Sequence, residues 1–195
     1  MQALNVRFSI ITPTCGRETL KRTLDSMVAN GLSAEDEVII VGDGPQPRAF
    51  EIAQQYQGRI NYRYMQTEPD HCVGHPQRNL AMPYASGTHL LSIDDDDEYA
   101  KGALTLLRSV AAENPDKIII SRMVHRSEGL IWKTQRVVEN NVGTALYTVP
   151  NIKERLGQWG RRYAGDYDFI RSTVDKWPGK DSSVYWHEAI TIIYH

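Results

Sequence analysis

Segments rich in β-forming residues alternate with segments of helical periodicity along the first 121 residues, and this alternation constrains the fold most. The apolar, β-branched runs are residues 6–12, 37–41, 59–65, 88–93 and 117–121. The helical segments between them are residues 17–30, 48–56, 76–86 and 101–113. Strand–helix–strand units join parallel strands through right-handed crossovers that cover both faces of a sheet. The sequence therefore predicts an α/β fold that is Rossmann-like, with a mostly parallel central sheet and helices on both faces.

The pattern changes after Met123. Short, antiparallel strands are predicted at residues 130–137 and 144–149, followed by a helix at 166–177 and a last strand at 184–194. We expect these segments to form a small antiparallel, partly helical C-terminal portion. A length of 195 residues suits one domain, so residues 1–195 are predicted to form a single domain with parts 1–123 and 124–195.

The charge and the cysteine content limit which binding partners and which cellular location are expected for the chain. The chain has 22 Lys and Arg against 24 Asp and Glu, so its net charge of −2 gives no general attraction to nucleic acid or anionic lipid. Two cysteines, Cys15 and Cys72, cannot build a disulfide framework, and the N-terminus lacks a secretory pattern. No apolar run approaches the length of a membrane span. A cytoplasmic location is expected.

Three predicted strands run directly into loops that carry polar groups, namely residues 12–17, 42–45 and 94–97. The last of these holds four consecutive aspartates after an apolar strand, and their mutual repulsion makes such a run costly without a cation. In extended backbone Asp94 and Asp96 share one face and offer two hard oxygen ligands to Mn²⁺ or Mg²⁺. The alternative is a solvated acidic turn. The position at the carboxyl end of a strand, where ligands bind in α/β sheets, favours a metal site.

Known phosphate-binding loops are absent from the sequence. The stretch Gly42-Asp43-Gly44-Pro45-Gln46-Pro47 begins like a dinucleotide fingerprint but has proline in place of the third glycine, and no P-loop occurs. Bound phosphates would therefore be held by metal and side chains. Arg78 is a candidate clamp, or else a surface arginine.

The combination FSIITPTCGR, EVIIVGDG, PQRNLAMPYASGTHLLSIDDDDEY and YAGDYDF resembles the family 2 glycosyltransferases of the GT-A fold over most of the chain. The resemblance implies transfer of a sugar from a nucleotide diphosphate sugar to an acceptor hydroxyl, with inversion at the anomeric carbon. It implies that residues 1–123 bind the nucleotide sugar and that residues 124–195 form the acceptor side.

The same resemblance implies a role for individual residues. It places Thr12, Pro13 and Arg17 in the nucleotide pocket. In the same pocket it implies that Asp43 accepts a hydrogen bond from the base, that Arg78 faces the diphosphate and that Asp95 lies near the ribose. It assigns to the metal Asp94, Asp96 and a third ligand, His187. Asp43 also suits an ordinary Asp-Gly turn, and a lone histidine is more often structural.

Asp166 is the general base that the resemblance implies. An inverting transfer needs a carboxylate that takes the proton of the attacking hydroxyl, together with neutralisation of the departing diphosphate. The chain has Gly165-Asp166 where the family more often has Glu-Asp, so Asp168 is an alternative. Helix capping is a second explanation for both aspartates.

Two further groups of residues have competing interpretations. Residues 70–75 contain His71, Cys72 and His75, whose spacing matches no closed zinc site, and a loop over the nucleotide is expected. The four tryptophans all follow Met123, where core packing is favoured over stacking on a ligand.

The sequence thus predicts a metal-dependent, inverting glycosyltransferase that uses Mn²⁺ or Mg²⁺ and a nucleotide-sugar donor, with a UDP-sugar expected. The acceptor is a glycan, a lipid-linked sugar or another hydroxyl, a modified DNA base included. A metal-dependent phosphohydrolase or nucleotidyltransferase would use a similar aspartate cluster, and a binding module without turnover would keep the same fold.

Overall fold

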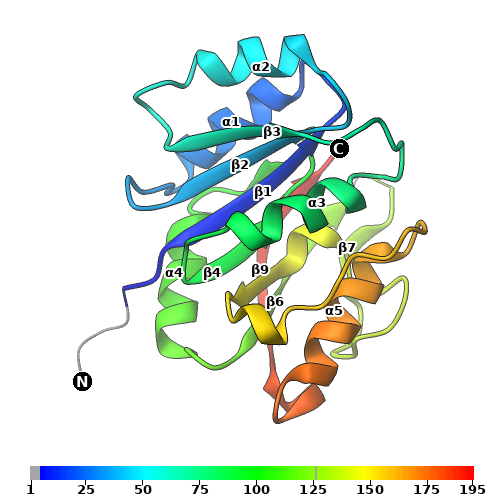
Figure 1. The fold of residues 1–195 in the computed structure, drawn as a ribbon. Helices are drawn as coiled ribbons and strands as arrows, with labels where there is room; N and C mark the ends of the chain where they lie inside the picture. The colour runs from blue at the N-terminus through cyan, green and yellow to red at the C-terminus, as the bar shows by residue number, and fades with distance from the viewer. Residues whose placement is uncertain (1–4, 126) are drawn as a thin grey trace.

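The computed structural model describes residues 5–125 and 127–195, and within them nine strands form one sheet (Figure 1). The strands are β1 Phe8–Thr14, β2 Glu37–Gly42, β3 Tyr62–Gln66, β4 His89–Ser92, β5 Glu98–Tyr99, β6 Ile118–His125, β7 Gly129–Ile131, β8 Tyr147–Pro150 and β9 Val184–Tyr194. Their order is β3-β2-β1-β4-β8-β6-β9-β5, and β7 pairs with the outer part of β6.

Within the described part of the chain, five α-helices and four short 3₁₀ helices connect the strands. They are α1 Leu20–Ala29, α2 Pro47–Gln54, α3 His75–Ala81, α4 Ala103–Glu113, α5 Gly165–Lys176, η1 Met82–Tyr84, η2 Thr144–Leu146, η3 Lys153–Arg155 and η4 Lys180–Ser183. Figure 1 shows α3 and α5 on the near face of the sheet and α1 behind it. None of the helices in the described ranges is long and apolar enough to cross a bilayer.

The four strands β3, β2, β1 and β4 are parallel, as predicted. Ile10 of β1 pairs with Val38 on one side and with Leu91 on the other, so β1 is the central strand of this part. Strands covered on both faces read as continuous apolar runs, and every residue of β1 and β4 is buried. The predicted Rossmann-like α/β sheet is confirmed.

The rest of the sheet is mixed. β8 runs antiparallel to both β4 and β6, and β5 runs antiparallel to β9. β9 has the predicted bounds, Val184–Tyr194, and lies parallel to β6 with register shifts beside Arg122. The antiparallel C-terminal portion was predicted, whereas the two-residue strand β5 was not.

The predicted strand at residues 130–137 is wrong beyond its first two residues, because β7 ends at Ile131. The Asn141 side chain binds the loop that follows. Its Oδ1 accepts from the backbone N–H groups of Lys133 (3.0 Å) and Thr134 (3.2 Å), and its Nδ2 donates to the carbonyl of Arg136 (2.7 Å). These bonds satisfy backbone groups that a strand would pair with a neighbour.

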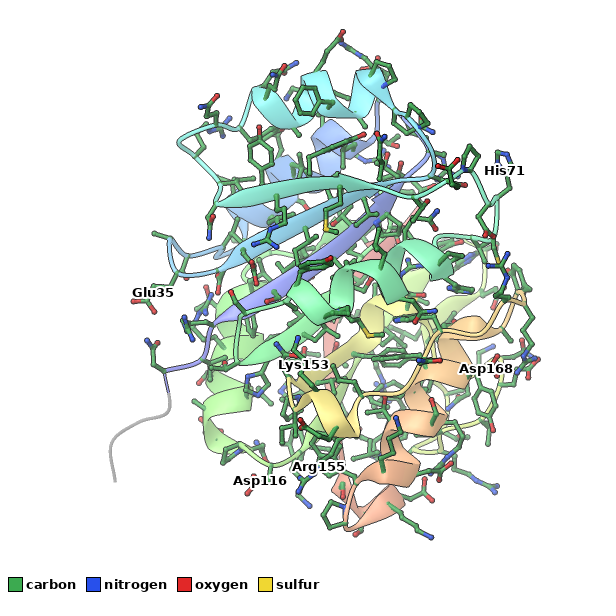
Figure 2. The ribbon with its side chains drawn as sticks, viewed as in Figure 1. Glu35, His71, Asp116, Lys153, Arg155 and Asp168 are labelled. Atoms are coloured by element: carbon green, nitrogen blue, oxygen red, sulfur yellow. The ribbon has the colours of Figure 1, made fainter. Side chains whose placement is uncertain are left out.

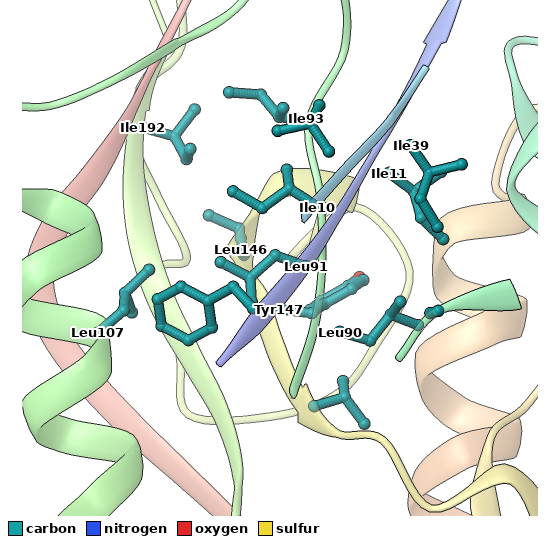
Figure 3. Packing of buried hydrophobic residues seen from close by; sticks show 14 of the residues in the cluster. Ile10, Ile11, Ile39, Leu90, Leu91, Ile93, Leu107, Leu146, Tyr147 and Ile192 are labelled. Atoms are coloured by element: carbon teal, nitrogen blue, oxygen red, sulfur yellow. The ribbon is translucent and has the colours of Figure 1, made fainter. Parts of the chain in front are cut away.

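One hydrophobic core joins the parallel and antiparallel parts. Figure 3 shows Ile10 and Leu91 from the parallel strands packed near Leu146 and Ile192 from the C-terminal portion. The core continues under the helices through residues such as Leu107. This shared core fixes the carboxyl ends of the parallel strands relative to the C-terminal segments that face them.

Candidate active site

Two pockets adjoin at the carboxyl edge of the parallel strands. The first, called here the strand-end pocket, has a volume of about 370 Å³. It is lined by Pro13, Thr14, Cys15, Arg17, Asp43, His71, Val73, Gly74, Gln77, Asp94, Asp95, Asp96 and Tyr194. The second, called the α5 pocket, has a volume of about 260 Å³. It is lined by Val73, His75, Asp94, Asp97, Met123, His125, Glu128, Ile131, Asn140, Val142, Gly143, Thr144, Ala145, Tyr163, Ala164, Asp166 and Tyr194.

The strand-end pocket brings together the three loops that the sequence singles out. Parallel strands β1, β2 and β4 end at the same edge of the sheet, so residues 13–17, Asp43 and residues 94–96 converge there. Gly74 contributes by its lack of a side chain, because a Cβ atom on it would lie 2.7 Å from Pro13. Val73, Asp94 and Tyr194 line both pockets and form the wall between them.

Arg17 and Thr14 fix two of the aspartates. The Thr14 hydroxyl donates to Asp95 Oδ2 at 2.6 Å, and Arg17 Nη1 contacts Asp95 Oδ1 at 3.1 Å and Asp96 Oδ2 at 2.5 Å. Burial raises the pKa of Asp95, against the lowering effect of the Thr14 hydrogen bond and the Arg17 charge. Arg17 thus supplies positive charge directly at the acidic edge of the pocket.

Arg78 lies beneath the pocket rather than in its wall. The side chain is 1% exposed and pairs with Asp94, while Nε donates to Ser92 Oγ at 2.9 Å and Nη1 to the carbonyl of Val73 at 3.0 Å. Its guanidinium also stacks over Trp159, 4.9 Å from the ring centroid. The expectation that Arg78 faces a diphosphate is therefore not met in this structure, since its donors are used to hold Asp94 and the loop before α3.

Thr12 also differs from expectation, because its side chain is fully buried and does not line the strand-end pocket. The neighbours Pro13 and Thr14 line the pocket instead.

Asp43 binds the loop that precedes α3. Its Oδ1 accepts from the backbone N–H of Asp70 (2.6 Å) and from Gln77 Nε2 (2.9 Å), and its Oδ2 accepts from the backbone N–H of His71 (2.9 Å). The loop turns sharply, with positive φ at His71, Val73 and Gly74. His71 and Val73 then border the strand-end pocket. That this loop lies over a nucleotide stays a prediction.

Asp166 and Asp168 have different surroundings at the start of α5. Asp166 is half-buried, lines the α5 pocket and accepts a hydrogen bond from the Tyr167 backbone N–H at 2.7 Å. Asp168 lines neither pocket and forms a two-pronged ion pair with Arg162, with contacts of 2.8 and 2.6 Å. Figure 2 shows Asp168 at the right-hand edge of the molecule.

The pKa values of the two carboxyls shift in opposite directions. Burial raises the pKa of Asp166, opposed by the Tyr167 hydrogen bond and by the charge of Arg78. The hydrogen bond from Arg162 lowers the pKa of Asp168. A carboxylate with a raised pKa is the better proton acceptor, so the geometry distinguishes two residues that the sequence left as alternatives.

Trp159 links the two sides of the site, a role that the sequence gave no signal for. Its ring stacks on Phe169 of α5 at 4.5 Å and on His75 of α3 at 5.5 Å, besides the contact with Arg78. Asn79 holds its backbone through two hydrogen bonds, of 2.9 and 3.0 Å. The expected core role of the tryptophans is confirmed for Trp132, Trp159 and Trp177, which are all buried.

The end of β9 completes the wall between the pockets. Tyr194 stacks on His125 at 4.4 Å, and the backbone N–H of His195 donates to Asp97 Oδ1 at 3.2 Å. Burial, with the neighbouring Asp94 charge, raises the pKa of Asp97 to about 8. Asp97, Tyr163 and Tyr194 are site residues that sequence reasoning did not assign.

His187 lies apart from the aspartates. It is in β9 near the register shift, its Nδ1 accepts from the Ala189 backbone N–H at 3.1 Å, and it lines neither pocket. Trp186 and Tyr194 pair with Ile120 and His125 of β6, which are five residues apart, so the two ends of β9 are about 16 Å from each other. The strand that carries His187 reaches the site only at its other end, so His187 is not placed to share a cation with Asp94 and Asp96.

The aspartates fit a divalent cation that also has ligands from a bound molecule. Within the described residues, no group of three or more His, Cys, Asp and Glu side chains is arranged to hold a metal ion. Asp94 pairs with Arg78 through Oδ1 and Asp96 with Arg17 through Oδ2, which leaves one oxygen of each carboxylate for another partner. Mg²⁺ typically takes one or two protein carboxylates and completes its shell with phosphate oxygens and water. The donor set suits that arrangement.

Comparisons with known proteins agree with this architecture. Residues 9–176 match the family model described as Glycosyl transferase family 2. The chain is 26% identical over 120 residues to the poly(ribitol-phosphate) beta-N-acetylglucosaminyltransferase TarS of Staphylococcus aureus strain Mu50, an alignment that covers 60% of this chain and 21% of that protein. The chain therefore aligns with about a fifth of the length of this curated relative.

Solved structures show the same fold. S. aureus TarS 1–349 in complex with UDP superposes with a TM-score of 0.77 at 19% identity, covering 96% of this chain and 60% of that one. The mannosyltransferase PcManGT from Pyrobaculum calidifontis, in complex with GDP-Man and Mn²⁺, superposes with a TM-score of 0.72 at 15% identity, covering 96% and 56%.

Proposed function

Because the chain belongs to glycosyl transferase family 2, we propose that it transfers a sugar from a UDP-sugar to an acceptor hydroxyl, with a divalent cation and with inversion at the anomeric carbon. A relative named as an N-acetylglucosaminyltransferase, and the complexes of TarS 1–349 with UDP and UDP-GlcNAc, support a uridine nucleotide as the donor. The complex of PcManGT with Mn²⁺ supports the cation.

One observation carries the proposal: the strand-end pocket and the α5 pocket meet at Asp94. A glycosyl transfer needs the departing diphosphate and the attacking hydroxyl on opposite sides of one carbon atom. A nucleotide in the first pocket and an acceptor in the second would meet at this shared wall. The separation of the two pockets therefore favours direct displacement with inversion.

We assign the donor side to residues of the first part of the chain, 1–123. Pro13, Arg17, Asp43 and Asp95 line the strand-end pocket and would contact the nucleotide. Asp94 and Asp96 would hold Mn²⁺ or Mg²⁺, which supplies positive charge for the leaving diphosphate when bound. Arg78 acts through Asp94, which it fixes from below.

We assign the acceptor side to residues 124–195, together with Met123, Asp94 and Asp97, which also line the α5 pocket. Asp166 is assigned as the base. As the acceptor oxygen forms its bond to the anomeric carbon, the hydroxyl proton passes to the Asp166 carboxylate. The bond from that carbon to the diphosphate oxygen breaks, and the electron pair leaves with the nucleotide.

A matched pair of variants tests this assignment. Asp166→Asn removes the proton acceptor at nearly constant size and is expected to lower transfer by a factor of 10² or more, in the range that general bases contribute. Asp168→Asn disturbs only the exposed pair with Arg162 and is expected to keep transfer within a few fold. The measurement is formation of UDP and of glycosylated product from radiolabelled UDP-GlcNAc.

The alternatives predict different products. A phosphohydrolase would release inorganic phosphate, a nucleotidyltransferase would release pyrophosphate, and a binding module would release neither. Equal losses in Asp166→Asn and Asp168→Asn would contradict the assignment of Asp166.

A further inference from the structure

A third pocket lies between β9, α5 and the loop that follows β7. It has a volume of about 380 Å³ and is called here the β9 pocket. It is lined by Gln135, Arg136, Val137, Val138, Arg171, Asp181, Val184 and Trp186. Sites that bind small organic ligands have volumes of about 300–1,000 Å³. The β9 pocket shares no lining residue with the strand-end pocket or the α5 pocket, so it is a separate candidate site.

Trp186 gives the β9 pocket an aromatic wall. Its ring makes an edge contact with the ring of Trp132, with 5.0 Å between the centroids and an angle of 74° between the planes. Trp132 is buried, and Arg122 stacks over it at 4.3 Å from the centroid. Trp186 itself is half-buried, and Val184 lies on the same side of β9. The pocket therefore presents an indole ring that is supported from behind.

The polar side chains of the pocket include both donors and acceptors of hydrogen bonds. Arg171 contacts Asp175 and Asp181, each at 2.7 Å, and these two ion pairs orient its guanidinium. Gln135 and Arg136 are exposed side chains of the loop. A sugar hydroxyl both donates and accepts, so guanidinium, amide and carboxylate groups suit a ring that carries several hydroxyls. The aromatic wall suits the C–H faces of the same ring.

The loop after β7 joins the β9 pocket to the α5 pocket. Ile131 and Asn140, near the two ends of the loop, line the α5 pocket, and residues 135–138 between them line the β9 pocket. Val138 and Asn140 are two positions apart, so their Cα atoms are at most about 7 Å from each other. The side chain of Asn141 binds the loop backbone through the hydrogen bonds described above. The two pockets are therefore close together on either side of one ordered loop.

Helix α5 makes a second connection between these pockets. Asp166 lines the α5 pocket, and Arg171, five residues further, lines the β9 pocket. At 1.5 Å per residue, the two positions are about 7.5 Å apart along the helix axis. Arg162 joins Asp168 of α5 at 2.6 Å to Glu139 of the loop at 3.0 Å. These distances bring both pockets within reach of one short oligosaccharide.

From this arrangement we propose that the β9 pocket is a second carbohydrate subsite, which binds a sugar residue of the acceptor remote from the reacting hydroxyl. The ring of that residue packs on Trp186, and its hydroxyls bind Arg136 and Arg171. The acceptor is then an oligosaccharide or a longer glycan chain. The proposal rests on the proposed function, since it extends the acceptor side of the same site. Linked contacts make the second binding event intramolecular, so affinity should rise with acceptor length.

The experiment uses the full chain with saturating UDP and Mg²⁺ and measures oligosaccharide binding by NMR titration. The probes are three series of one to five units: β-1,4-linked glucose, α-1,4-linked glucose and β-1,4-linked N-acetylglucosamine. In at least one series we expect the tetramer to bind at least tenfold more tightly than the monosaccharide. Trp186→Ala should reduce this ratio at least fivefold and leave the affinity for the monosaccharide within twofold.

Further variants separate a binding role of Trp186 from a structural one. Trp186→Phe keeps an aromatic face and should restore most of the ratio. Arg136→Gln alters an exposed side chain and should weaken binding of the tetramer at least twofold without changing the melting temperature. Tyr185→Ala alters the next residue of β9, an exposed tyrosine that lines none of the three pockets, and should leave the ratio unchanged.

The indole N–H signal of Trp186 reports directly on the pocket. It should shift when the tetramer binds and stay in place with the monosaccharide. The signal of Trp177 is the control, because that ring is buried and its Nε1 donates to the carbonyl of Asp116 at 2.9 Å.

Equal affinity for all chain lengths, a Trp186 signal that stays in place when the tetramer binds, or no binding of any oligomer would overturn the proposal. The UDP signals in the same samples report separately on the proposed function. If UDP itself does not bind, the proposed function fails. If UDP binds and affinity does not depend on chain length, only the inference about the second subsite fails.

Discussion

Asp166 and Asp168 are only two positions apart, yet their surroundings give them different chemistry. Burial raises the pKa of Asp166 at the pocket, and Arg162 lowers the pKa of Asp168 at the surface. Environment rather than residue type therefore separates a base from a surface ion pair.

The raised pKa of Asp166 has a consequence for the pH dependence of transfer. A general base works in its deprotonated form, so kcat/KM is expected to fall as pH drops through the pKa of Asp166. Because that pKa is raised, the fall should begin above the pH at which an ordinary aspartate, of pKa 3.8, protonates. The measurement is the pH profile of transfer, compared with the pH profile of UDP binding, which does not need the base.

The raised pKa of Asp166 also predicts how the stability of the fold changes with pH. A carboxyl whose pKa is higher in the folded chain stabilises the fold while protonated, and this contribution is lost as pH rises through the folded pKa. Asp166→Asn should therefore raise the melting temperature at neutral pH while it lowers transfer. A lower melting temperature, or an acidic limb at the ordinary aspartate value, would contradict this account of Asp166.

The positions of single side chains in the site were the feature that the sequence predicted least well. The motif positions located the pocket, since Pro13, Arg17, Asp43 and Asp94–Asp96 do converge. Whether a given side chain lines the pocket depends on its burial and on the partners it finds. Thr12 is fully buried, and Arg78 is used by Asp94, Ser92 and Val73. The local sequence predicts neither the burial of Thr12 nor the partners of Arg78.

Among the elements, α5 matters most for the site because its first turn carries the proposed base. Gly165 begins the helix against α3, where an added Cβ atom would lie 2.3 Å from the Gly160 carbonyl oxygen and 2.5 Å from the His75 ring. Trp159 fills the space between His75 and Phe169 and fixes the same end of the helix.

Gly165→Ala is therefore expected to displace the first turn of α5. Overpacking of this kind destabilises proteins by about 1–3 kcal/mol, and displacement of Asp166 should lower transfer at least tenfold. The measurements are thermal unfolding and the transfer rate. Gly58→Ala is the control, because its φ of +78° adds strain but a Cβ atom there meets nothing within 4 Å. Unchanged transfer in Gly165→Ala would refute the tight packing of this helix end.

Elements were predicted well where periodicity or turn residues define them. β9 and the helices α4 and α5 lie within a few residues of their predicted bounds, since their apolar spacing is regular. The segment after Ile131 resembles a strand in composition, but Asn141 binds its backbone into a loop. A side-chain bond from a residue several positions further along the chain leaves no periodic pattern.

At the scale of the whole molecule, one core joins the parallel strands to the C-terminal segments, so the two pockets are held against each other. The first part of the chain supplies most of the strand-end pocket, and the second part supplies most of the α5 pocket. The fold class followed from the strand–helix alternation because parallel sheets leave few arrangements open. The juxtaposition of the pockets at Asp94 depends on the packing of both parts and required the structure.

The central claim is that a divalent cation at Asp94 and Asp96 joins a nucleotide to the acidic edge of the sheet. Isothermal titration of UDP into the full chain, in Mn²⁺ and then in EDTA, tests it most directly. We predict binding at least tenfold tighter with Mn²⁺, a gain lost in Asp96→Asn and kept in Asp116→Asn, which alters an aspartate at the far end of the molecule (Figure 2). Equal UDP affinity in Mn²⁺ and in EDTA would contradict the claim.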